Sequence, residues 1–403
     1  MIDKKIFEFP ILYTLPMGKI AIGWGVHETV ADECKEAKIK RALITTTGLK
    51  GTGIVDEIKG ILNHHGIATE IFSKVTSNPK DYEVMEAYQV FKDTRCDGVV
   101  SVGGGSSHDC GKGVRAVACN GGRYVCDMAM FINPPWMEER KKYNPVTIPQ
   151  VAVNTTAGTG AESGIGAAII NTPARAKQLL FLTGQTAQAA LIDPLLVRLM
   201  PQNITAWTGM DALAHAFESY VSRIHSDYTA ALMLRAIKLV AENLREFTYN
   251  RMNHQACINM CRASSVAAVG MQLGSGPGIV HGLAHTLSVL TGCHHGRSNA
   301  VFALAGERYN QSSCPQKFAE MARAMGVDTT GMTAMRASDQ WFAEVEKLLQ
   351  DLGIQSGNLH AQFGLKREDF GHMVDVYAND FCSQSNPRDF NRADCLSLLE
   401  SLY

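Results

Sequence analysis

The sequence predicts a two-domain protein, with an α/β N-terminal domain built on a parallel sheet (residues 1–190) and an all-α C-terminal domain (residues 191–403). A length of 403 residues is more than one hydrophobic core usually supports, so two domains are expected. Short β-branched runs alternate with helix-period segments in the first half, which is typical of a parallel sheet. In the second half, long helix-period segments follow one another with few strand signals.

The first half is predicted to alternate strands with helices. Residues 41–47 (RALITTT) and 98–102 (GVVSV) have the β-branched character of strands. Between them, residues 53–65 and 81–92 carry apolar side chains at helical spacing. Residues 146–153 (VTIPQVAV) are expected to form a further strand. Strands that end in glycine-rich turns, as these do, favour a sheet of the nucleotide-binding type.

The second half is predicted to be mostly helical. The pattern changes after residues 192–194 (IDP), and long helical periodicity appears, for example, in residues 228–246 and 339–352. We therefore place the domain boundary near residue 190.

Composition and charge exclude several classes of protein. Apolar residues make up 46% of the chain and charged residues 19%, as in globular proteins. The formal net charge is −1, so no summed field would draw the chain to nucleic acid or anionic lipid. No apolar stretch is long enough to span a membrane, and residues 1–25 lack the apolar core of a signal peptide. We expect a cytoplasmic protein without nucleic-acid or membrane partners.

The cysteines point to reduced thiols. There are 11 of them, an odd number, and they are scattered singly along the chain. The nearest pair, Cys257 and Cys261, has the i, i+4 spacing of a helix. A disulfide framework is therefore not expected, and a reducing compartment fits better.

Two glycine-rich turns follow predicted strands. Residues 101–113 (SVGGGSSHDCGKG) place three consecutive glycines between a strand and an expected helix. Glycine lets the backbone approach a ligand closely, and free N–H groups at a helix start attract anions. Taken alone, this turn is as consistent with a structural tight turn as with a pyrophosphate cradle. A second turn, residues 155–160 (TTAGTG), favours a dinucleotide site, because such sheets bind nucleotides at the carboxyl ends of their strands.

Histidines are concentrated in one short segment. Residues 281–296 (HGLAHTLSVLTGCHHG) hold four of the 13 histidines of the chain. His281 and His285 are spaced to share one face of a helix, and His295 could fold back onto them if a turn forms at residues 291–293. Burying so many unpaired imidazoles would be costly, so a common partner is expected.

A carboxylate and a further histidine occur upstream at the same spacing. Residues 208–220 (TGMDALAHAFESY) place Asp211 and His215 at i, i+4 near the start of an expected helix. For this pair alone, a surface pair or a helix cap is the simpler explanation. Together with the histidine-rich segment, it indicates a site for a divalent ion such as Fe²⁺ or Zn²⁺ between packed helices.

These segments together resemble the iron-dependent (group III) alcohol dehydrogenase family, within it most closely the methanol dehydrogenase and nicotinoprotein methanol oxidoreductase branch. The segments that carry the resemblance are GGGSSHD (103–109), TTAGTGAES (155–163), IDP (192–194), TGMDALAHAFESYV (208–221), GIVHGLAHTL (278–287), HHGRSNAV (294–301) and SQSNPR (383–388), with TTGLKGTGIV (46–55) and SNPKDYEVMEA (77–87) typical of the branch. The resemblance implies the dehydroquinate synthase-like fold, in which a Rossmann-like domain and a helical domain enclose the active site.

The resemblance also assigns candidate site residues. The positions that match the family's metal ligands are Asp211, His215, His281 and His295. His285 matches a catalytic histidine implicated in proton transfer. The positions that match cofactor-binding residues are Thr47, Asn78, Gly104, Gly105, Ser106, Asp109, Thr155, Thr156 and Lys177. The implied cofactors are NAD or NADP and a divalent metal ion, with Fe²⁺ favoured and Zn²⁺ as the alternative.

Three departures from the family pattern bear on these assignments. Thr47 stands where many members carry an acidic residue that excludes a 2′-phosphate, which leaves both NAD(H) and NADP(H) open. The usual proline before the last ligand is His294 here, so His294 is an alternative to His295, although Gly296 favours His295. Ala161 replaces a common serine and removes no ligand.

The implied activity is that of a metal-dependent NAD(P) alcohol dehydrogenase or aldehyde reductase, interconverting a small primary alcohol and its aldehyde by hydride transfer. Alternatives within the family are a nicotinoprotein, whose permanently bound NADP(H) is reoxidised by an external acceptor or by aldehyde dismutation, and a reductase of a sulfonated or hydroxylated aldehyde. Two alternatives lie outside this family. One is the zinc-dependent architecture of glycerol dehydrogenase and dehydroquinate synthase, and the other is a non-catalytic protein with the same fold. The resemblance also implies a homo-oligomer, either a dimer or a decamer.

Overall fold

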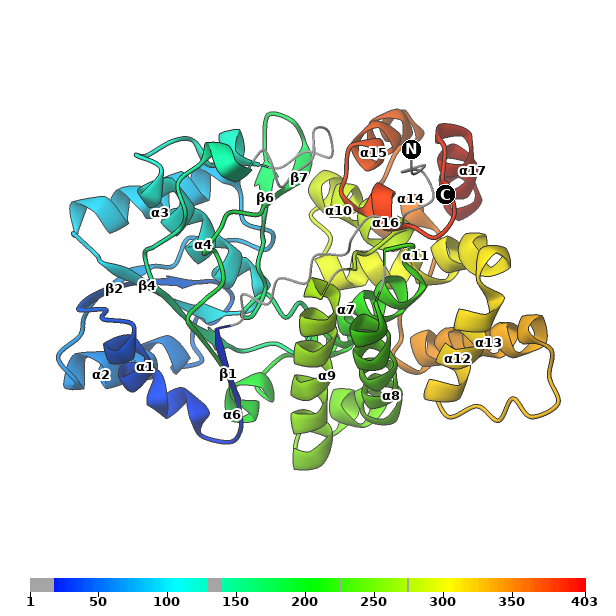
Figure 1. The fold of residues 1–403 in the computed structure, drawn as a ribbon, viewed down its shortest axis with the longest axis horizontal. Helices are drawn as coiled ribbons and strands as arrows, with labels where there is room; N and C mark the ends of the chain where they lie inside the picture. The colour runs from blue at the N-terminus through cyan, green and yellow to red at the C-terminus, as the bar shows by residue number, and fades with distance from the viewer. Residues whose placement is uncertain (1–17, 130–139, 225, 274) are drawn as a thin grey trace, which may run out of the picture.

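The computed structural model describes residues 18–129, 140–224, 226–273 and 275–403. Residues 1–17, which contain most of the segment examined for a signal peptide, lie outside the described part. Figure 1 shows an α/β region at the left, in blue to green, and a region of packed helices at the right, in green to red. The predicted fold class is therefore confirmed.

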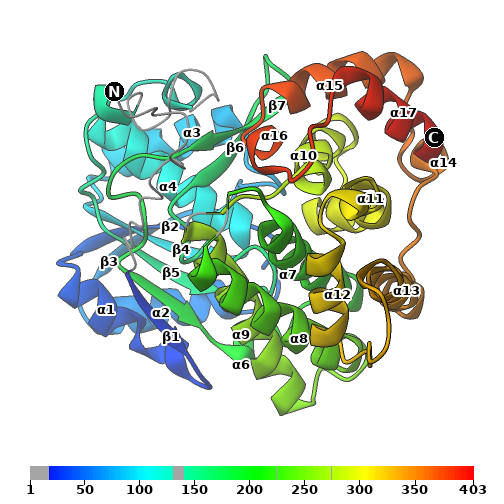
Figure 2. The same cartoon turned by 45° about the vertical axis from the view of Figure 1, so that its right-hand side comes forward.

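The first region is built on a six-stranded sheet in which every neighbouring pair of strands is parallel. The strand order is β1-β8-β5-β4-β2-β3. Their bounds are β1 (Lys19–Ile22), β2 (Arg41–Thr46), β3 (Ala68–Phe72), β4 (Gly98–Gly103), β5 (Gln150–Asn154) and β8 (Ala189–Ile192). The central strands β4 and β5 lie side by side, so the two glycine-rich turns that follow them meet at the same edge of the sheet (Figure 2).

Helices cover both faces of this sheet, with α1 (Val30–Glu36) and α2 (Ile54–His64) on one face and α3 (Asp81–Asp93) and α4 (Gly105–Cys119) on the other (Figure 1). Successive strand residues point to opposite faces. On β2, Leu43 packs in the core under α3 and α4, while the next residue, Ile44, packs in the core under α1 and α2. A strand buried on both faces needs a continuous apolar run, which explains the RALITTT pattern.

The region between β5 and β8 differs from the prediction. An antiparallel hairpin of β6 (Ala167–Asn171) and β7 (Ala176–Leu180), which the sequence analysis does not include, lies there. The strand expected from residue 146 forms only from Gln150 onward. Pro149 has no N–H to donate to a ladder, and the N–H of Val146 donates instead to the Thr183 carbonyl at 2.8 Å.

The second region is helical, as predicted, and from Pro194 onward its described residues contain no strand. The α-helices are α6 (Pro194–Val197), α7 (Gln202–Val221), α8 (Asp227–Tyr249), α9 (His254–Gln272), α10 (Ile279–Thr291), α11 (His295–Asn310), α12 (Pro315–Ala324), α13 (Ala334–Asp351), α14 (Leu359–Phe363), α15 (Phe370–Ala378), α16 (Cys382–Ser385) and α17 (Arg392–Leu402). Short 3₁₀ helices are η1 (Val26–Thr29), η2 (Val125–Met128), η3 (Arg140–Lys142), η4 (Gln311–Ser313) and η5 (Arg367–Asp369). Helix α8 includes the predicted segment 228–246, and α13 includes all of the predicted segment 339–352 except its last residue, Leu352.

The second glycine-rich turn joins the two regions. A Cβ atom on Gly158 would lie 2.6 Å from the backbone oxygen of Thr208 on α7. A Cβ atom on Gly160, whose φ is +60°, would lie 2.1 Å from the Cβ of Ala268 on α9. Both positions therefore require glycine, because the turn after β5 is pressed directly against the helical region.

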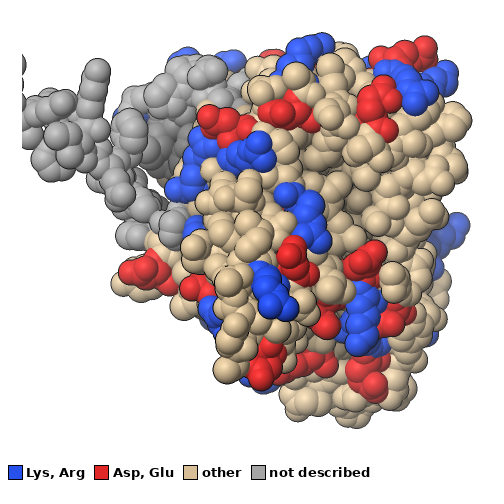
Figure 3. Space-filling model, turned by 90° about the vertical axis from the view of Figure 1, so that its right-hand side faces the viewer, with Lys and Arg blue, Asp and Glu red and all other residues tan. Residues whose placement is uncertain are grey.

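Three expectations about composition can be compared with the structure. All 11 cysteines are free thiols, as predicted. Among the described residues, no helix combines the length and apolar character that crossing a bilayer requires. On the face shown in Figure 3, basic and acidic side chains are interspersed rather than gathered into one large area of a single sign.

A buried ion pair links η1 to the segment after β8. The His27 imidazole contacts the Asp193 carboxylate, which also accepts the His27 backbone N–H at 3.1 Å and that of Leu195 at 2.8 Å. The hydrogen bond with Asp193 raises the pKa of the His27 imidazole above its ordinary value of 6.5. Burial acts to raise the pKa of the Asp193 carboxyl, but the hydrogen bonds from His27 and Leu195 outweigh burial and hold that pKa below 3.8.

We expect this pair to stabilise the fold within a limited pH window. The contribution of His27 is complete below pH 6.5 and is lost as the pH rises through its raised pKa. The contribution of Asp193 is present above pH 3.8 and is lost as the pH falls through its lowered pKa. The urea midpoints of the wild type and His27→Gln should therefore differ more at about pH 5.5 than at about pH 8.5. The exposed His64→Gln serves as control, and equal differences at both pH values would refute the prediction.

Candidate metal centre and cofactor-binding turns

Helix α7 carries the first two candidate ligands into the protein interior. Asp211 and His215 lie one turn apart on a helix that is buried on nearly every side from Thr205 to Val221. Asp211 is 1% exposed and His215 is 7% exposed. A carboxylate at such a depth is stable only with positive or hydrogen-bonding partners.

Helices α10 and α11 bring three histidines to the same place. His281 and His285 lie one turn apart on α10, and both are buried. Helix α10 ends at Gly292, whose φ of +71° turns the chain back so that α11 begins at His295. The turn predicted at residues 291–293 is therefore confirmed, and it returns His295 to the α10 histidines.

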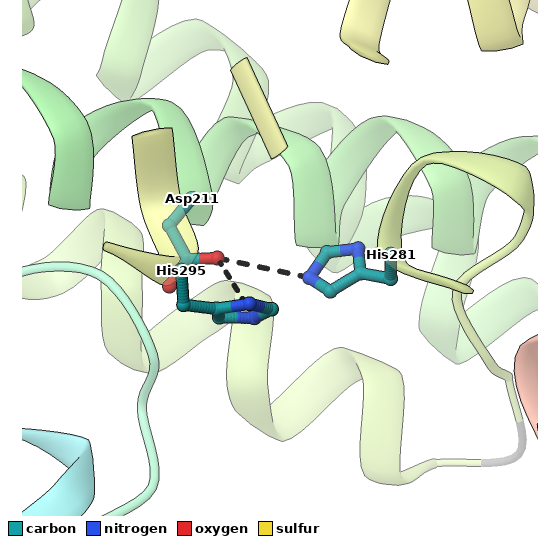
Figure 4. Close-up of side chains that lie close together, drawn as sticks. All are labelled: Asp211, His281 and His295. Carbon is teal, nitrogen blue, oxygen red and sulfur yellow. Dashed lines mark ion pairs between the residues drawn. The ribbon is translucent and has the colours of Figure 1, made fainter. Parts of the chain in front are cut away.

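The imidazoles of His281 and His295 lie beside the Asp211 carboxylate (Figure 4). Its Oδ1 atom lies 3.7 Å from the Nε2 atom of His281 and 3.7 Å from the Nε2 atom of His295. The Nδ1 atom of His215 lies 3.9 Å from the same oxygen, and its ring centroid is 4.4 Å from that of His281. The ligand atoms of Asp211, His281 and His295 all lie within 4.8 Å of one another, and His215 adjoins this group through its contact with Asp211.

The protonation of Asp211, His215 and His295 suits metal ligation, whereas His281 has to release a proton to bind an ion. Burial lowers the pKa of His215 to about 4 and also holds the pKa of His295 well below its usual range, so both rings are neutral at pH 7. Burial acts to raise the pKa of Asp211, but His215 and His295 outweigh burial and lower it, so the carboxylate is ionised. Burial also acts to lower the pKa of His281, but Glu218 and Asp211 raise it to about 9.

The donor set fits a divalent first-row ion. Two ligands bound tetrahedrally at about 2.1 Å from one ion lie roughly 3.4 Å apart, close to the separations of 3.7 to 3.9 Å between Asp211 and the three histidines. The Nδ1 atom of His215, which is the atom of that ring nearest the Asp211 carboxylate, is buried without a hydrogen-bond partner among the described residues. Such an orphaned imidazole atom is costly, and a metal ion at the cluster would supply the missing partner.

His294 occupies a different position from His295. Its Nδ1 atom accepts the backbone N–H of Gly296 at 3.2 Å, which caps α11, and its ring centroid lies 5.5 Å from that of Trp207. A Cβ atom on Gly296 would lie 2.2 Å from the Trp207 backbone oxygen. The close approach of α11 to α7 thus depends on this glycine, and it is His295 that reaches the cluster.

Two residues of the site were missed in the sequence analysis, Glu218 and Asn299. The buried Glu218 carboxylate on α7 contacts the His281 Nδ1 atom and accepts the backbone N–H groups of Gly278 at 2.9 Å and Val280 at 2.7 Å. Asn299 on α11 donates to Asp211 Oδ1 at 2.6 Å. Helical spacing places both on the same helix faces as candidate ligands, since Glu218 follows His215 by three residues and Asn299 follows His295 by four, but it does not identify the side chains that they contact.

The two glycine-rich turns form one continuous surface. The Thr155 N–H donates to the Gly103 carbonyl at 3.0 Å, and a Cβ atom on Gly104 would lie 2.7 Å from Thr156 Cγ2. Gly104 caps α4 without a side-chain hydrogen bond, so the first N–H groups of that helix, beginning at Gly105, are left for a ligand. Candidate cofactor residues from both turns are therefore adjacent.

Three further cofactor candidates are linked by hydrogen bonds. Asn78, held in the left-handed region with a φ of 55°, donates its backbone N–H to Ser106 Oγ at 3.0 Å. Its side-chain oxygen accepts from the Lys177 ammonium on β7 at 3.0 Å. Asp109 lies one turn inside α4, where burial raises the pKa of its carboxyl, and Lys112 Nζ is 4.0 Å away.

Thr47 lies beside a cavity of about 700 Å³ at the ends of β2 and β3. Its backbone N–H donates to Ser107 Oγ at 3.1 Å, which ties the end of β2 to the first glycine-rich turn. Thr46 and Lys50 also line the cavity, and the Thr46 hydroxyl is buried without a hydrogen-bond partner among the described residues. Asp56, on the first turn of α2, is the acidic residue in its lining.

Comparisons with known sequences agree with this architecture. The family profile described as iron-containing alcohol dehydrogenase matches residues 17–194. The profile described as the C-terminal part of the Fe-containing alcohol dehydrogenase family matches residues 205–403. The chain therefore belongs to the iron-containing alcohol dehydrogenase family. It is a metal- and NAD(P)-dependent oxidoreductase that acts on CH–OH donors.

Individual relatives point to the methanol branch, as the sequence predicts. The methanol:N,N-dimethyl-4-nitrosoaniline oxidoreductase of Amycolatopsis methanolica is 39% identical over 357 residues, which are 88% of this chain and 81% of the relative. The NAD-dependent methanol dehydrogenase of Bacillus methanolicus is 33% identical over 381 residues, covering 94% and 97% of the two chains. A crystal structure of 1,3-propanediol oxidoreductase superposes with a TM-score of 0.89 at 34% identity, covering 97% of this chain and all of the other.

Proposed function

We propose that this protein interconverts a small, short-chain primary alcohol such as methanol and its aldehyde by hydride transfer to and from NAD(P). The observation that carries the proposal is the buried cluster in which Asp211 Oδ1 lies 3.7 Å from the Nε2 atoms of both His281 and His295. This set of metal-ligand side chains suits a redox enzyme that binds the substrate oxygen at a metal ion. The cluster belongs to the helical region, against which the second glycine-rich turn packs.

The proposed metal ligands are Asp211, His215, His281 and His295, with Fe²⁺ as the favoured ion and Zn²⁺ as the alternative. When bound, the ion polarises the oxygen of the alcohol or aldehyde, and the nicotinamide accepts or returns the hydride. The protein holds the ligands in their neutral or ionised forms and excludes water from them. His285, whose ring lies 5.4 Å from that of His295, is the proposed proton acceptor.

The proposed cofactor site lies along the carboxyl edge of the sheet. The free N–H groups at the start of α4, with Gly104, Gly105 and Ser106, are suited to the pyrophosphate. Thr155 and Thr156 extend this surface towards the helical region. The remaining cofactor-binding residues of the proposal are Thr47, Asn78, Asp109 and Lys177.

The experiment that tests this function combines elemental analysis with a substrate panel. Purified protein should contain close to one divalent ion per chain and should turn over short primary alcohols or their aldehydes with NAD(H) or NADP(H). The panel includes 1,3-diols and hydroxylated or sulfonated aldehydes, which would identify a reductase of a functionalised aldehyde. Absence of turnover with every substrate and both cofactors in metal-loaded protein would contradict the proposal.

The cofactor preference can be tested at the cavity beside Thr47. An uncharged residue here does not repel a 2′-phosphate, and the ammonium of Lys50 in the same lining attracts one. We expect Thr47→Asp to lower kcat/KM for NADP(H) by about 10-fold or more relative to NAD(H), since one unfavourable charge contact costs on the order of 1.4 kcal/mol or more. Thr47→Ser serves as the matched control. An unchanged ratio of the two kcat/KM values would show that Thr47 does not face the ribose.

A second candidate function is a nicotinoprotein reaction, in which the cofactor never dissociates. It is favoured by the relative from Amycolatopsis methanolica, whose name specifies N,N-dimethyl-4-nitrosoaniline as the acceptor for methanol oxidation. Nicotinamide absorbance that stays with the protein through extended gel filtration would support this candidate. Apoprotein that turns over freely added NAD(P) would exclude it.

We also propose a homo-oligomer, a dimer or a decamer, in the cytoplasm, with the chain divided near residue 190 into a nucleotide-binding and a metal-binding domain. Light scattering after gel filtration distinguishes the two assemblies from a monomer. Strand β8 crosses the proposed boundary, so a fragment that ends at residue 190 should fold less well than one that ends at residue 194.

A further inference from the structure

His285 has a carboxylate partner of its own. The Nδ1 atom of the imidazole lies 2.8 Å from Oδ2 of Asp380, a residue 95 positions later in the chain. His285 is 6% exposed and Asp380 is 8% exposed, so their contact is shielded from water. Among the described residues, this is the one hydrogen bond that the His285 ring makes.

The backbone fixes the Asp380 carboxylate in place. Asp380 lies in the turn between α15 and α16, where its N–H donates to the Tyr377 carbonyl at 3.0 Å. Its Oδ1 atom accepts the backbone N–H of Cys382 at 2.9 Å. One carboxylate oxygen therefore anchors the turn, while the other is left for His285. A side chain held in this way is already oriented before any substrate arrives.

This contact determines which nitrogen of His285 carries the proton. An ionised carboxylate only accepts hydrogen bonds, so the Nδ1 atom of a neutral His285 must be the donor. The opposite nitrogen, Nε2, then keeps its lone pair and can accept a proton. The ring stacks on His295 with centroids 5.4 Å apart and an interplanar angle of 18°, and it lies 6.1 Å from His281. The unprotonated nitrogen thus belongs to a ring that borders the metal cluster.

We propose that Asp380 is the positioning residue of His285: it holds the imidazole in the Nδ1–H tautomer, so that Nε2 takes the proton of the substrate alcohol. This inference rests on the proposed function. In oxidation, the O–H bond breaks and its proton moves to Nε2, while the hydride, with its electron pair, passes from the carbinol carbon to the oxidised nicotinamide. The resulting imidazolium is stabilised by Asp380 and later releases its proton to solvent. The net products are the aldehyde, the reduced nicotinamide and one proton.

A second metal ion is the main alternative explanation of this cluster. His285, Asp380 and Cys382 offer ligand atoms that lie within 4.8 Å of one another. The 2.8 Å between Nδ1 and Oδ2 is, however, a hydrogen-bond distance, shorter than the roughly 3.4 Å between two tetrahedral ligands of one ion. The other carboxylate oxygen is also engaged by the backbone of Cys382. The geometry therefore favours a hydrogen bond.

The direct test is Asp380→Asn. The asparagine oxygen can still accept the Cys382 N–H, but its NH₂ group would donate to Nδ1 and thereby move the ring proton to Nε2. We expect kcat for the alcohol to fall by about 100-fold or more, since general acid–base catalysis contributes about 10²–10⁴-fold. The KM for the alcohol, the metal content and the nicotinamide affinity should stay near wild-type values. Asp375→Asn, on the exposed face of α15, is the matched control.

Two further readouts separate positioning from a structural role. In ¹⁵N-histidine-labelled protein, the His285 signals should show a protonated Nδ1 in the wild type and a protonated Nε2 in Asp380→Asn. In a double-mutant cycle, adding Asp380→Asn to His285→Gln should slow the enzyme no further, because Asp380 acts through the ring that is already absent. The cycle compares rates on equal amounts of metal-loaded protein, so it remains informative if the single variant folds in lower yield.

The proposal is overturned by any of four results: wild-type kcat in Asp380→Asn, additive losses in the cycle, an unchanged tautomer, or two bound ions per chain with His285 as a ligand. Its failure is distinguishable from failure of the proposed function. A wild type that turns over no alcohol or aldehyde contradicts the function, whereas the ¹⁵N spectrum reports the tautomer of His285 whether or not a substrate is known.

Discussion

Replacing His281 with alanine is expected to abolish metal binding and turnover together while the chain stays folded. The imidazole is buried at 2% exposure between the carboxylates of Asp211 and Glu218. Losing the Lewis acid removes several kcal/mol of transition-state stabilisation, so kcat should fall by about 1,000-fold or more. His295→Ala should likewise abolish metal binding and turnover, because His295 contributes a proposed ligand from α11.

The measurement pairs metal content with turnover for each variant. Elemental analysis after dialysis should show sub-stoichiometric metal for His281→Ala and His295→Ala, with a circular dichroism spectrum that matches the wild type. His254→Ala, an exposed histidine on the first turn of α9, should keep full metal and full activity. If His281→Ala retained wild-type metal content and rate, the assignment of His281 as a ligand would be wrong.

Replacing Glu218 is expected to produce the largest loss of stability. Its carboxylate is 1% exposed and accepts the N–H groups of Gly278, Val280 and His281 at the start of α10, in addition to contacting the His281 ring. Glu218→Ala would leave these donors buried without partners, and breaking one side of a buried charged pair costs about 3–5 kcal/mol. Urea unfolding of metal-free protein should show a corresponding loss.

The conservative variant separates stability from metal affinity. Glu218→Gln keeps an acceptor oxygen for the α10 N–H groups but loses the negative charge that orients His281. We expect metal affinity to fall by about 10–100-fold, the usual effect of removing a carboxylate behind a ligating histidine, with a smaller loss of stability. Competition with a chromophoric chelator measures the affinity. An unchanged dissociation constant for Glu218→Gln would show that the carboxylate acts only as a helix cap.

Part of the proximity of the candidate ligands could be predicted because its signals are local. Asp211 and His215 lie one helical turn apart, and so do His281 and His285, so each pair shares a face whatever the tertiary structure is. The return of His295 depends on the turn at Gly292, which glycine marks in the sequence. Helix periodicity and a glycine cap thus bring His281, His285 and His295 together, whereas the approach of α7 to them depends on tertiary packing.

The carboxylates behind the histidines could not be assigned from the same signals. Glu218 and His281 are 63 residues apart, and His285 and Asp380 are 95 residues apart. A glutamate on an apolar helix face indicates that some buried partner exists, but no local pattern tells which one. Those contacts are set by the packing of α7, α10 and the α15–α16 turn, so they appear only in the folded structure.

The strand predicted from residue 146 was partly wrong because one proline overrides the β-propensity of its neighbours. Residues 146–153 are rich in β-branched side chains, yet Pro149 prevents a continuous ladder and the strand begins at Gln150. The hairpin of β6 and β7 was missed because its two strands are five residues each and one of them carries the mixed sequence AKQLL. Strand β7 nevertheless carries Lys177, a candidate cofactor-binding residue. The hairpin that the sequence pattern did not predict is therefore part of the candidate cofactor site.

The most direct test of the account is anomalous diffraction from crystals of the metal-loaded protein. We predict one strong anomalous peak for each chain, about 2.0–2.2 Å from Asp211 and from the three imidazoles of His215, His281 and His295. A peak at a different set of side chains, or a fully active enzyme with no peak at this cluster, would contradict the account.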